Sequence, residues 1–249
     1  MESSPSLLNT KLEKNAVAIS TRGFTLVEMM VVLAIILVIT SIALLGQSSF
    51  NRSLVLTDTA YTIAFSVREA QSLGISSRKA GTIQNAGYGV HFSANATNYI
   101  LFADTNPVAP GDTANPSVCS GHTATSGPEA KPGNCMYDAV SEIVRTYTLN
   151  KGFRIKSFCG TPEGGGEERC STSSSSALQA LDILYMRPNT NSVIVGITNS
   201  SFPAPLSARV ALTDATIRVA SPDGTAERCI YVSQAGQVSV QQPGGPQCP

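Results

Sequence analysis

Six cysteines are the residues in this sequence with the clearest capacity for chemistry, and all of them lie beyond residue 118. Their even number and the absence of a Cys-x-x-Cys pair favour disulfides formed in an oxidising compartment. Pairing between sequence neighbours is the simplest arrangement. Each such bridge closes a short loop and stabilises the folded chain by about 2–4 kcal/mol. The expected pairs are Cys119–Cys135, Cys159–Cys170 and Cys229–Cys248.

A metal site is the alternative for one of these pairs. Cys119-Ser-Gly-His122, followed by Cys135, has ligand-like spacing. A structural zinc ion takes four ligands, and no fourth Cys or His lies near these three in the sequence. We therefore expect disulfides and no metal, with zinc as the competing interpretation.

Catalytic motifs are absent from the sequence. It contains two histidines, His91 and His122, and neither Gly-x-Ser-x-Gly nor His-Glu-x-x-His. The glycine-rich stretch 160–166 lacks the lysine of a phosphate-binding loop. His91 alternates with Val90 and Phe92, which predicts a strand residue on the face opposite those two. We expect no enzyme and no cofactor. A hydrolase would need a fold that brings His91 beside a carboxylate and a serine in a cleft.

Glu28 is the one ionisable residue inside an apolar stretch that runs from Phe24 to Leu45. As a helix this stretch would span about 33 Å, enough for the hydrocarbon core of a bilayer. An ionisable group inside a membrane segment costs a few kcal/mol, which suggests a function and a partner of opposite charge. The alternative is a shallow position near the interface, where a helix N-terminus favours a carboxylate without any partner.

Three interpretations of the apolar stretch compete. It can be a plain membrane anchor, or a secretory signal with an uncharged core at 29–39 and a small-x-small cleavage site at 41–43. The third follows from Arg22 and the six residues after it, Gly23-Phe-Thr-Leu-Val-Glu28. This junction resembles the leader junction of type IV prepilins and of type II secretion pseudopilins.

The resemblance implies a specific maturation. A prepilin peptidase would cut after Gly23 on the cytoplasmic side, the new amine of Phe24 would be methylated, and the apolar segment would be kept. Glu28 would then pair with the Phe24 amine of a neighbouring subunit. Three basic residues precede the segment, which orients the N-terminus to the cytoplasm and the rest of the chain to the periplasm: Lys11, Lys14 and Arg22.

The elements after the apolar segment 24–45 follow from periodicity. Residues 46–81 are predicted to continue the helix, with Gly46 as a weak point and no proline to kink it. One apolar stripe recurs at three- and four-residue steps: Leu56, Ala60, Ile63, Val67, Ala70 and Leu73. The simplest role for this stripe is docking on a globular domain.

From residue 82 the period changes to two, which predicts an antiparallel β domain over 82–249. The expected strands are 87–93, 99–103, 139–149, 153–158, 181–186, 192–198, 208–212, 216–220, 228–233 and 237–241. Two long loops, 104–136 and 159–177, contain four of the cysteines. The expected fold class is therefore α+β, pilin-like, with a long N-terminal helix packed on antiparallel sheets and a leader at 1–23.

The C-terminal half narrows the resemblance. Three segments are similar to the GspH/FimT family, the H-type pseudopilins of type II secretion and related minor pilins: 181–188, 218–219 and 230–239. The resemblance implies a non-enzymatic structural subunit of the inner membrane that is extracted into a filament. Its expected partners are other pilins or pseudopilins, the prepilin peptidase and the inner-membrane assembly platform.

DNA capture is the alternative function. The chain has 17 basic and 17 acidic residues, so it has no general attraction for phosphates. Some FimT-type minor pilins bind DNA through a Gly-Arg-x-Arg motif, and the matching positions here are Gly236, Gln237 and Ser239, so both arginines are missing. Nucleic acid is therefore not an expected partner. The remaining cations for such a role are Arg209, Arg218 and Arg228.

Overall fold

The computed structural model describes residues 23–76, 79–81, 83, 85–106, 133–173, 177–188, 190–200, 206–245 and 248, with the backbone alone at 45–50 and 206. The chain divides into two compact units between Ser48 and Ser49. The strands all belong to the second unit, which also contains the later part of the helix.

One α-helix, α1, extends from Leu26 to Ile75. No proline interrupts it, and the backbone is helical at Gly46, where the sequence predicted a weak point. It ends before the segment 76–81 that was predicted to belong to the helix. The Ser76 hydroxyl donates to the Leu73 carbonyl, and Ala80 and Ile83 form an isolated antiparallel bridge just beyond.

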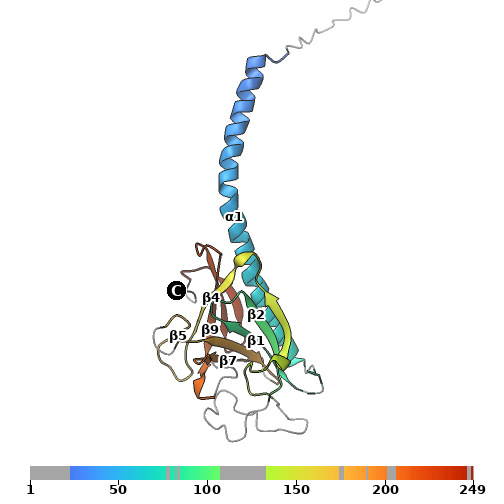
Figure 1. Ribbon diagram of the computed structural model, residues 1–249, viewed down its shortest axis with the longest axis vertical. Coiled ribbons are helices and arrows are strands. Elements are labelled where there is room, and N and C mark those ends of the chain that lie inside the picture. The colour runs from blue at the N-terminus through green and yellow to red at the C-terminus, as the bar shows by residue number, and fades with distance from the viewer. Residues whose placement is uncertain are drawn as a thin grey trace, which may run out of the picture. The chain divides into compact units, whose positions relative to one another are not determined.

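Eleven strands form two antiparallel sheets (Figure 1). The six-stranded sheet has the order β3-β2-β1-β6-β7-β8, and the five-stranded sheet has the order β11-β10-β9-β4-β5. The strands are β1 (Gly87–Ser93), β2 (Asn98–Asp104), β3 (Ile143–Thr148), β4 (Arg154–Gly160), β5 (Arg169–Cys170), β6 (Ala180–Tyr185), β7 (Ser192–Ile197), β8 (Arg209–Leu212), β9 (Asp214–Ala220), β10 (Glu227–Ser233) and β11 (Val238–Gln241). Short 3-10 helices occur at Val140–Glu142, Asn150–Gly152 and Leu206–Ala208. The α+β class predicted from the sequence is confirmed.

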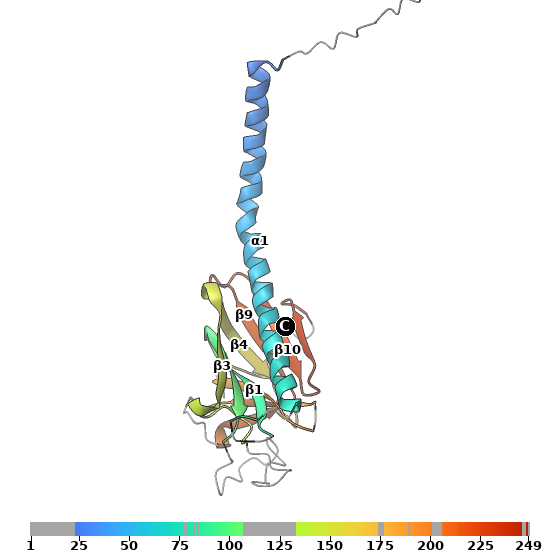
Figure 2. The same cartoon turned by 90° about the vertical axis from the view of Figure 1, so that its right-hand side faces the viewer.

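The core of the second unit lies between the later part of α1 and both sheets. The helix contributes the predicted apolar stripe, whose members from Leu56 to Ala70 are fully buried. The six-stranded sheet contributes residues such as Phe92 and Ile183, and the five-stranded sheet contributes residues such as Ile217 and Ile230. Figure 2 shows the cyan end of α1 running beside strands of both sheets. Burying these side chains together is the main favourable contribution to folding.

Polar contacts fix the same part of α1 along one side. The Arg228 guanidinium on β10 donates to the hydroxyls of Ser53 and Thr57, at 3.2 Å each. Arg68 on the helix donates to the Val238 carbonyl on β11 at 3.0 Å. Arg52 forms an ion pair with Asp223 in the β9–β10 turn. These bonds set the rotation of the helix, while the apolar stripe supplies the contact area.

Two regions differ from the predicted strands. The expected strand 139–149 begins only at Ile143, because the Glu142 carboxylate accepts backbone N–H groups from Thr105, Asn106 and Asp138 and folds 138–142 into a 3-10 turn. Strand β5 lies inside the predicted loop 159–177. It has only two residues and no alternating pattern, and it pairs with the end of β4.

Candidate functional site

The Gly23–Phe24 junction lies directly before the first turn of α1. Residues 23–25 are not helical and are exposed to solvent. The backbone N–H of Glu28 donates to the Thr25 hydroxyl at 3.2 Å, so Thr25 caps the helix three residues ahead of a glutamate, as in a capping box. A non-helical, exposed peptide bond followed by a capped helix is an accessible substrate for a peptidase.

Gly23 has no structural role in this arrangement. A Cβ placed on Gly23 would meet no described atom within 4 Å, and its φ lies outside the left-handed region that favours glycine. The fold of the described chain therefore does not require glycine here.

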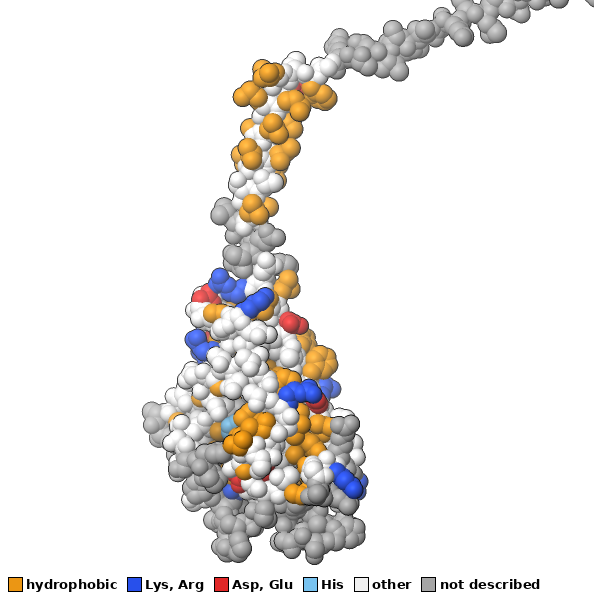
Figure 3. All heavy atoms as spheres, turned by 45° about the vertical axis from the view of Figure 1, so that its right-hand side comes forward, with side chains coloured by type: hydrophobic (Ala, Val, Ile, Leu, Met, Phe, Trp, Pro, Cys, Tyr) orange, Lys and Arg blue, Asp and Glu red, His pale blue; other side chains and the backbone are white. Residues whose placement is uncertain are grey.

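The apolar segment of α1 is exposed along its length. Residues Leu26–Leu44 form a helix long and apolar enough to cross a membrane, with a mean hydropathy of 2.7 and no buried residue. Hydrophobic side chains cover this segment in Figure 3. Leaving so many large apolar side chains in water is costly, so the segment requires lipid or the apolar surface of another protein.

Glu28 faces solvent in the first turn of α1. Among residues 23–76 its carboxylate has no hydrogen-bond or ion-pair partner, so the described part of the chain does not itself supply the positive charge expected to pair with it. The helix N-terminus alone favours a carboxylate there.

The later part of α1 has an exposed apolar stripe that was not predicted from the sequence. Leu54, Tyr61 and Phe65 are 53%, 50% and 67% exposed. At 100° per residue these three positions fall within about 40° of one another and lie on the side of the helix opposite the buried stripe. The signal was present in the sequence as a second set of seven- and four-residue steps. We call these three residues the outer stripe.

Two of the disulfides lie wholly within the described residues. Cys159–Cys170 joins the directly paired residues of β4 and β5, and Cys229–Cys248 ties the end of the chain to β10. Cys135 is also disulfide-bonded. Cys119, its expected partner, lies outside the described residues, as does His122. A cysteine in a disulfide offers no thiolate, so Cys135 is not a zinc ligand in this structure.

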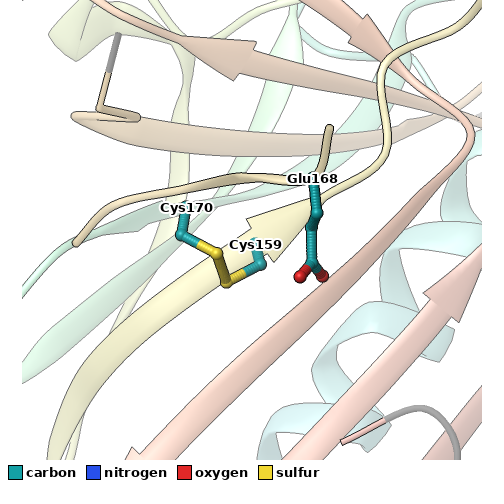
Figure 4. A group of neighbouring side chains, drawn as sticks. All are labelled: Cys159, Glu168 and Cys170. Atoms are coloured by element: carbon teal, nitrogen blue, oxygen red, sulfur yellow. A yellow bond between two sulfur atoms is a disulfide. The ribbon is translucent and has the colours of Figure 1, made fainter. Parts of the chain in front are cut away.

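Glu168 brings its carboxylate close to the Cys159–Cys170 pair (Figure 4). The sulfurs of the two cysteines are bonded to each other, so this cluster presents a single carboxylate rather than three ligands. The arrangement is a structural clamp on the two-residue strand β5.

His91 occupies β1, on the sheet face opposite Val90 and Phe92, as predicted. Its Nδ1 lies 2.6 Å from Oδ1 of Asp182 on β6, and its Nε2 lies 3.2 Å from the Ser93 hydroxyl. Asp182 is completely buried, and its Oδ2 accepts the backbone N–H of Tyr137 at 3.0 Å. The structure thus places His91 beside a carboxylate and a serine. The sequence predicted His91 only as a strand residue and did not predict these two side-chain contacts.

A second group of carboxylates holds the segment 133–142 against the outer face of the six-stranded sheet. Asp104 is fully buried and accepts the backbone N–H groups of Asn134 and Cys135, both at 2.8 Å. Burial raises the pKa of the Asp104 carboxyl well above its usual range, and the nearby Glu142 raises it further, while the two N–H groups oppose the shift. This role was not predicted from the sequence because the partners are about 30 residues apart.

The arginines considered for DNA binding are used inside the fold. Arg209 is buried and donates to the Asn134 carbonyl at 3.1 Å, and Arg228 is bonded to the helix as described above. Arg218 is half-buried on β9, and its side chain is not free of partners. These three cations therefore do not gather on an open surface where phosphates would reach them.

Comparison with known proteins gives one match. A family model described as the prokaryotic N-terminal methylation motif matches residues 20–44. No curated protein and no solved structure matches the chain. The matched residues contain the Gly23–Phe24 junction, the capped first turn with Glu28 and the exposed apolar segment. The motif indicates that this chain is a type IV pilin-like or pseudopilin protein, and its apolar helix fits an anchor in the inner membrane.

Proposed function

We propose that the chain is a structural subunit of a type IV pilus or type II secretion filament, of the minor pilin or H-type pseudopilin class. A prepilin peptidase removes residues 1–23, and the new N-terminus at Phe24 is methylated. Residues 24–45 first anchor the protein in the inner membrane and later pack in the filament. The domain 82–249 stays in the periplasm with its disulfides until the assembly platform extracts the subunit.

The observation that carries the proposal is the coincidence of the methylation motif with an exposed, non-helical Gly23–Phe24 bond at the start of an exposed apolar helix. A cleaved secretory signal would be discarded, and nothing would then depend on Glu28. A retained helix must bury its apolar surface in lipid or in other subunits. Glu28 then becomes useful, because an opposite charge on a neighbour matters most in a medium of low dielectric constant.

The outer stripe supports the same function. Leu54, Tyr61 and Phe65 lie on the side of α1 that the domain leaves open, on the same helix as the apolar segment. A monomer gains nothing from exposing three large apolar side chains on one face. Packing against another subunit would cover them.

Replacing Glu28 tests the assembly step. Glu28→Ala removes a charge from the apolar segment, so membrane insertion and leader cleavage should match the wild type. Incorporation into sheared filaments should fall roughly a hundredfold or more, because leaving the partner's buried amine unpaired costs about 3–5 kcal/mol. Glu28→Asp should recover part of the incorporation, since its carboxylate is one methylene shorter. The measurement is co-purification with filaments at matched membrane levels.

Glu167→Ala is the matched control, because Glu167 is an exposed carboxylate in the β domain. It should leave incorporation unchanged. Wild-type incorporation of Glu28→Ala would show that Glu28 has only an interfacial role and that the apolar helix alone drives assembly.

A further inference from the structure

The outer face of the six-stranded sheet holds a row of polar side chains that the assembly function does not use. The β1–β6 pairing sets His91 directly opposite Asp182. On the other side of β1 the pairing with β2 sets His91 opposite Ile100, and the same register continued by two pairs sets Asn98 opposite Ser93. His91 and Ser93 are two residues apart on one strand, so their side chains share this face.

A pocket of about 340 Å³ opens over this row. Its lining consists of His91, Ser93, Asn98, Tyr99, Ile100 and Tyr137. The Tyr137 ring lies against the imidazole, with ring centroids 4.8 Å apart. The volume is near the lower end of small-molecule sites, and the ring and Ile100 give it apolar walls. A short acyl group fits a pocket of this volume with apolar walls, and a long acyl chain does not.

The hydrogen bonds orient the imidazole for proton transfer. A carboxylate oxygen only accepts, so Nδ1 carries the proton that points to Asp182. Nε2 then presents its lone pair to the Ser93 hydroxyl at 3.2 Å, within the usual reach of a serine and its general base. Asp182 cannot turn away, because it is completely buried and its other oxygen is bonded to the Tyr137 N–H. This is the order of contacts that activates a serine nucleophile.

We propose that Ser93, His91 and Asp182 form an acyl-transfer site that hydrolyses small carboxylic esters. Ser93 and His91 are the catalytic residues, and Asp182 positions the imidazole. Asn98 supplies an amide N–H₂ next to Ser93, since side chains directly opposite in an antiparallel pair have Cβ atoms about 4.5–5.5 Å apart. Asn98 also lines the pocket, and in this proposal its amide stabilises the oxyanion that forms during attack.

The reaction needs only the ester and water as reactants. The Ser93 oxygen bonds to the ester carbonyl carbon while its proton passes to Nε2 of His91. The bond from that carbon to the leaving alcohol oxygen then breaks, and the imidazolium returns the proton to the alcohol. Water attacks the acyl-Ser93 by the same route, which releases the carboxylic acid and restores the serine.

The test uses the detergent-solubilised full-length chain with p-nitrophenyl acetate as substrate and a fluorophosphonate probe as covalent label. We expect hydrolysis above the buffer rate, and we expect mass mapping of the labelled wild type to place the probe on Ser93. Ser93→Ala should reduce hydrolysis to the background and abolish labelling. Ser141→Ala, an exposed serine outside this pocket, should behave as the wild type.

Two further variants separate catalysis from support of the fold. His91→Gln can still hydrogen-bond to Asp182 but is not a base, so kcat should fall by about 10²–10⁴ with the disulfides intact. Asp182→Asn should lower kcat with little change in KM, because it disturbs the tautomer rather than the pocket.

A label on any residue other than Ser93 would overturn the proposal. Hydrolysis that is as fast in Ser93→Ala as in the wild type would do the same, and so would a wild-type rate equal to the buffer rate.

Discussion

The two parts of α1 have similar helical geometry and opposite surroundings. Over Leu26–Leu44 every residue is exposed, including large side chains such as Ile36 and Leu37. Over residues 51–75, by contrast, one stripe is fully buried in the core of the domain and one is left open. The difference teaches that apolar content alone does not tell where a helix packs. The spacing does, because the later part gathers its apolar residues into stripes, whereas residues 26–44 are apolar on all sides of the helix.

The largest contrast comes from a charge placed in each part. Val67→Asp puts a carboxylate at a fully buried position without a partner and should destabilise the domain by about 4 kcal/mol or more. Val32→Asp, at a position that is 45% exposed, should leave the domain folded but weaken membrane insertion by about 2.5–3.5 kcal/mol.

Protease resistance of the domain and the share of protein in the membrane fraction measure the two effects. Equal loss of protease resistance in both variants would break the comparison, since it would mean that the apolar segment also supports the fold of the domain.

A smaller contrast compares the two sides of the later part. Ile63→Ala removes a fully buried side chain and should lower the free energy of unfolding by about 2–5 kcal/mol. Phe65 lies in the outer stripe, so Phe65→Ala should change the free energy of unfolding by about 0.5 kcal/mol or less. Chemical denaturation of the detergent-solubilised chain measures both. Phe65→Ala should instead reduce crosslinking to other filament subunits, and unchanged crosslinking would remove the outer stripe from the assembly surface.

The last contrast concerns the pH dependence of stability, which the buried carboxyl of Asp104 introduces and the apolar docking of α1 does not. Asp104 has a raised pKa in the folded chain, so between its ordinary value near 4 and that raised value the folded state binds more protons than the unfolded state. Stability from this group is therefore present at low pH and lost as pH rises through the folded pKa. Across that interval the free energy of unfolding falls by about 1.4 kcal/mol per pH unit.

Asp104→Asn should flatten this dependence in thermal unfolding measured from pH 4 to pH 8, because the amide has no proton to lose. The Ile63→Ala variant should be less stable at every pH but should show the same change of stability with pH as the wild type. Equal slopes in Asp104→Asn and the wild type would show that another group governs the pH dependence.

Much of the fold was predictable because periodicity reports which residues are buried. The stripe from Leu56 to Ala70 and ten of the eleven strands follow from steps of three, four or two residues. The contacts of the carboxylates were not predictable. Asp182 meets His91 across 91 positions through the β1–β6 register, and Asp104 meets Cys135 across 31 positions, outside any strand pairing. Polar residues show no period that would reveal such partners.

The proposed processing site shows the reverse situation. Gly23, Phe24 and Glu28 were proposed from the sequence, and the structure adds an exposed backbone and a capped turn at these positions. Nothing in the described fold requires a glycine at position 23. A short motif such as the N-terminal methylation motif is visible in the sequence because it does not depend on long-range contacts within the chain.

The N-terminus of the mature protein tests the central claim most directly. Mass spectrometry of the N-terminal peptide from the membrane fraction should find a chain that begins at Phe24 and carries a methyl group on its amine. Gly23→Val should leave the uncleaved chain in the membrane with its β domain folded, since the fold does not require this glycine. A mature chain that begins near Leu44 would instead identify a secretory signal and contradict the assignment as a pilin-like subunit.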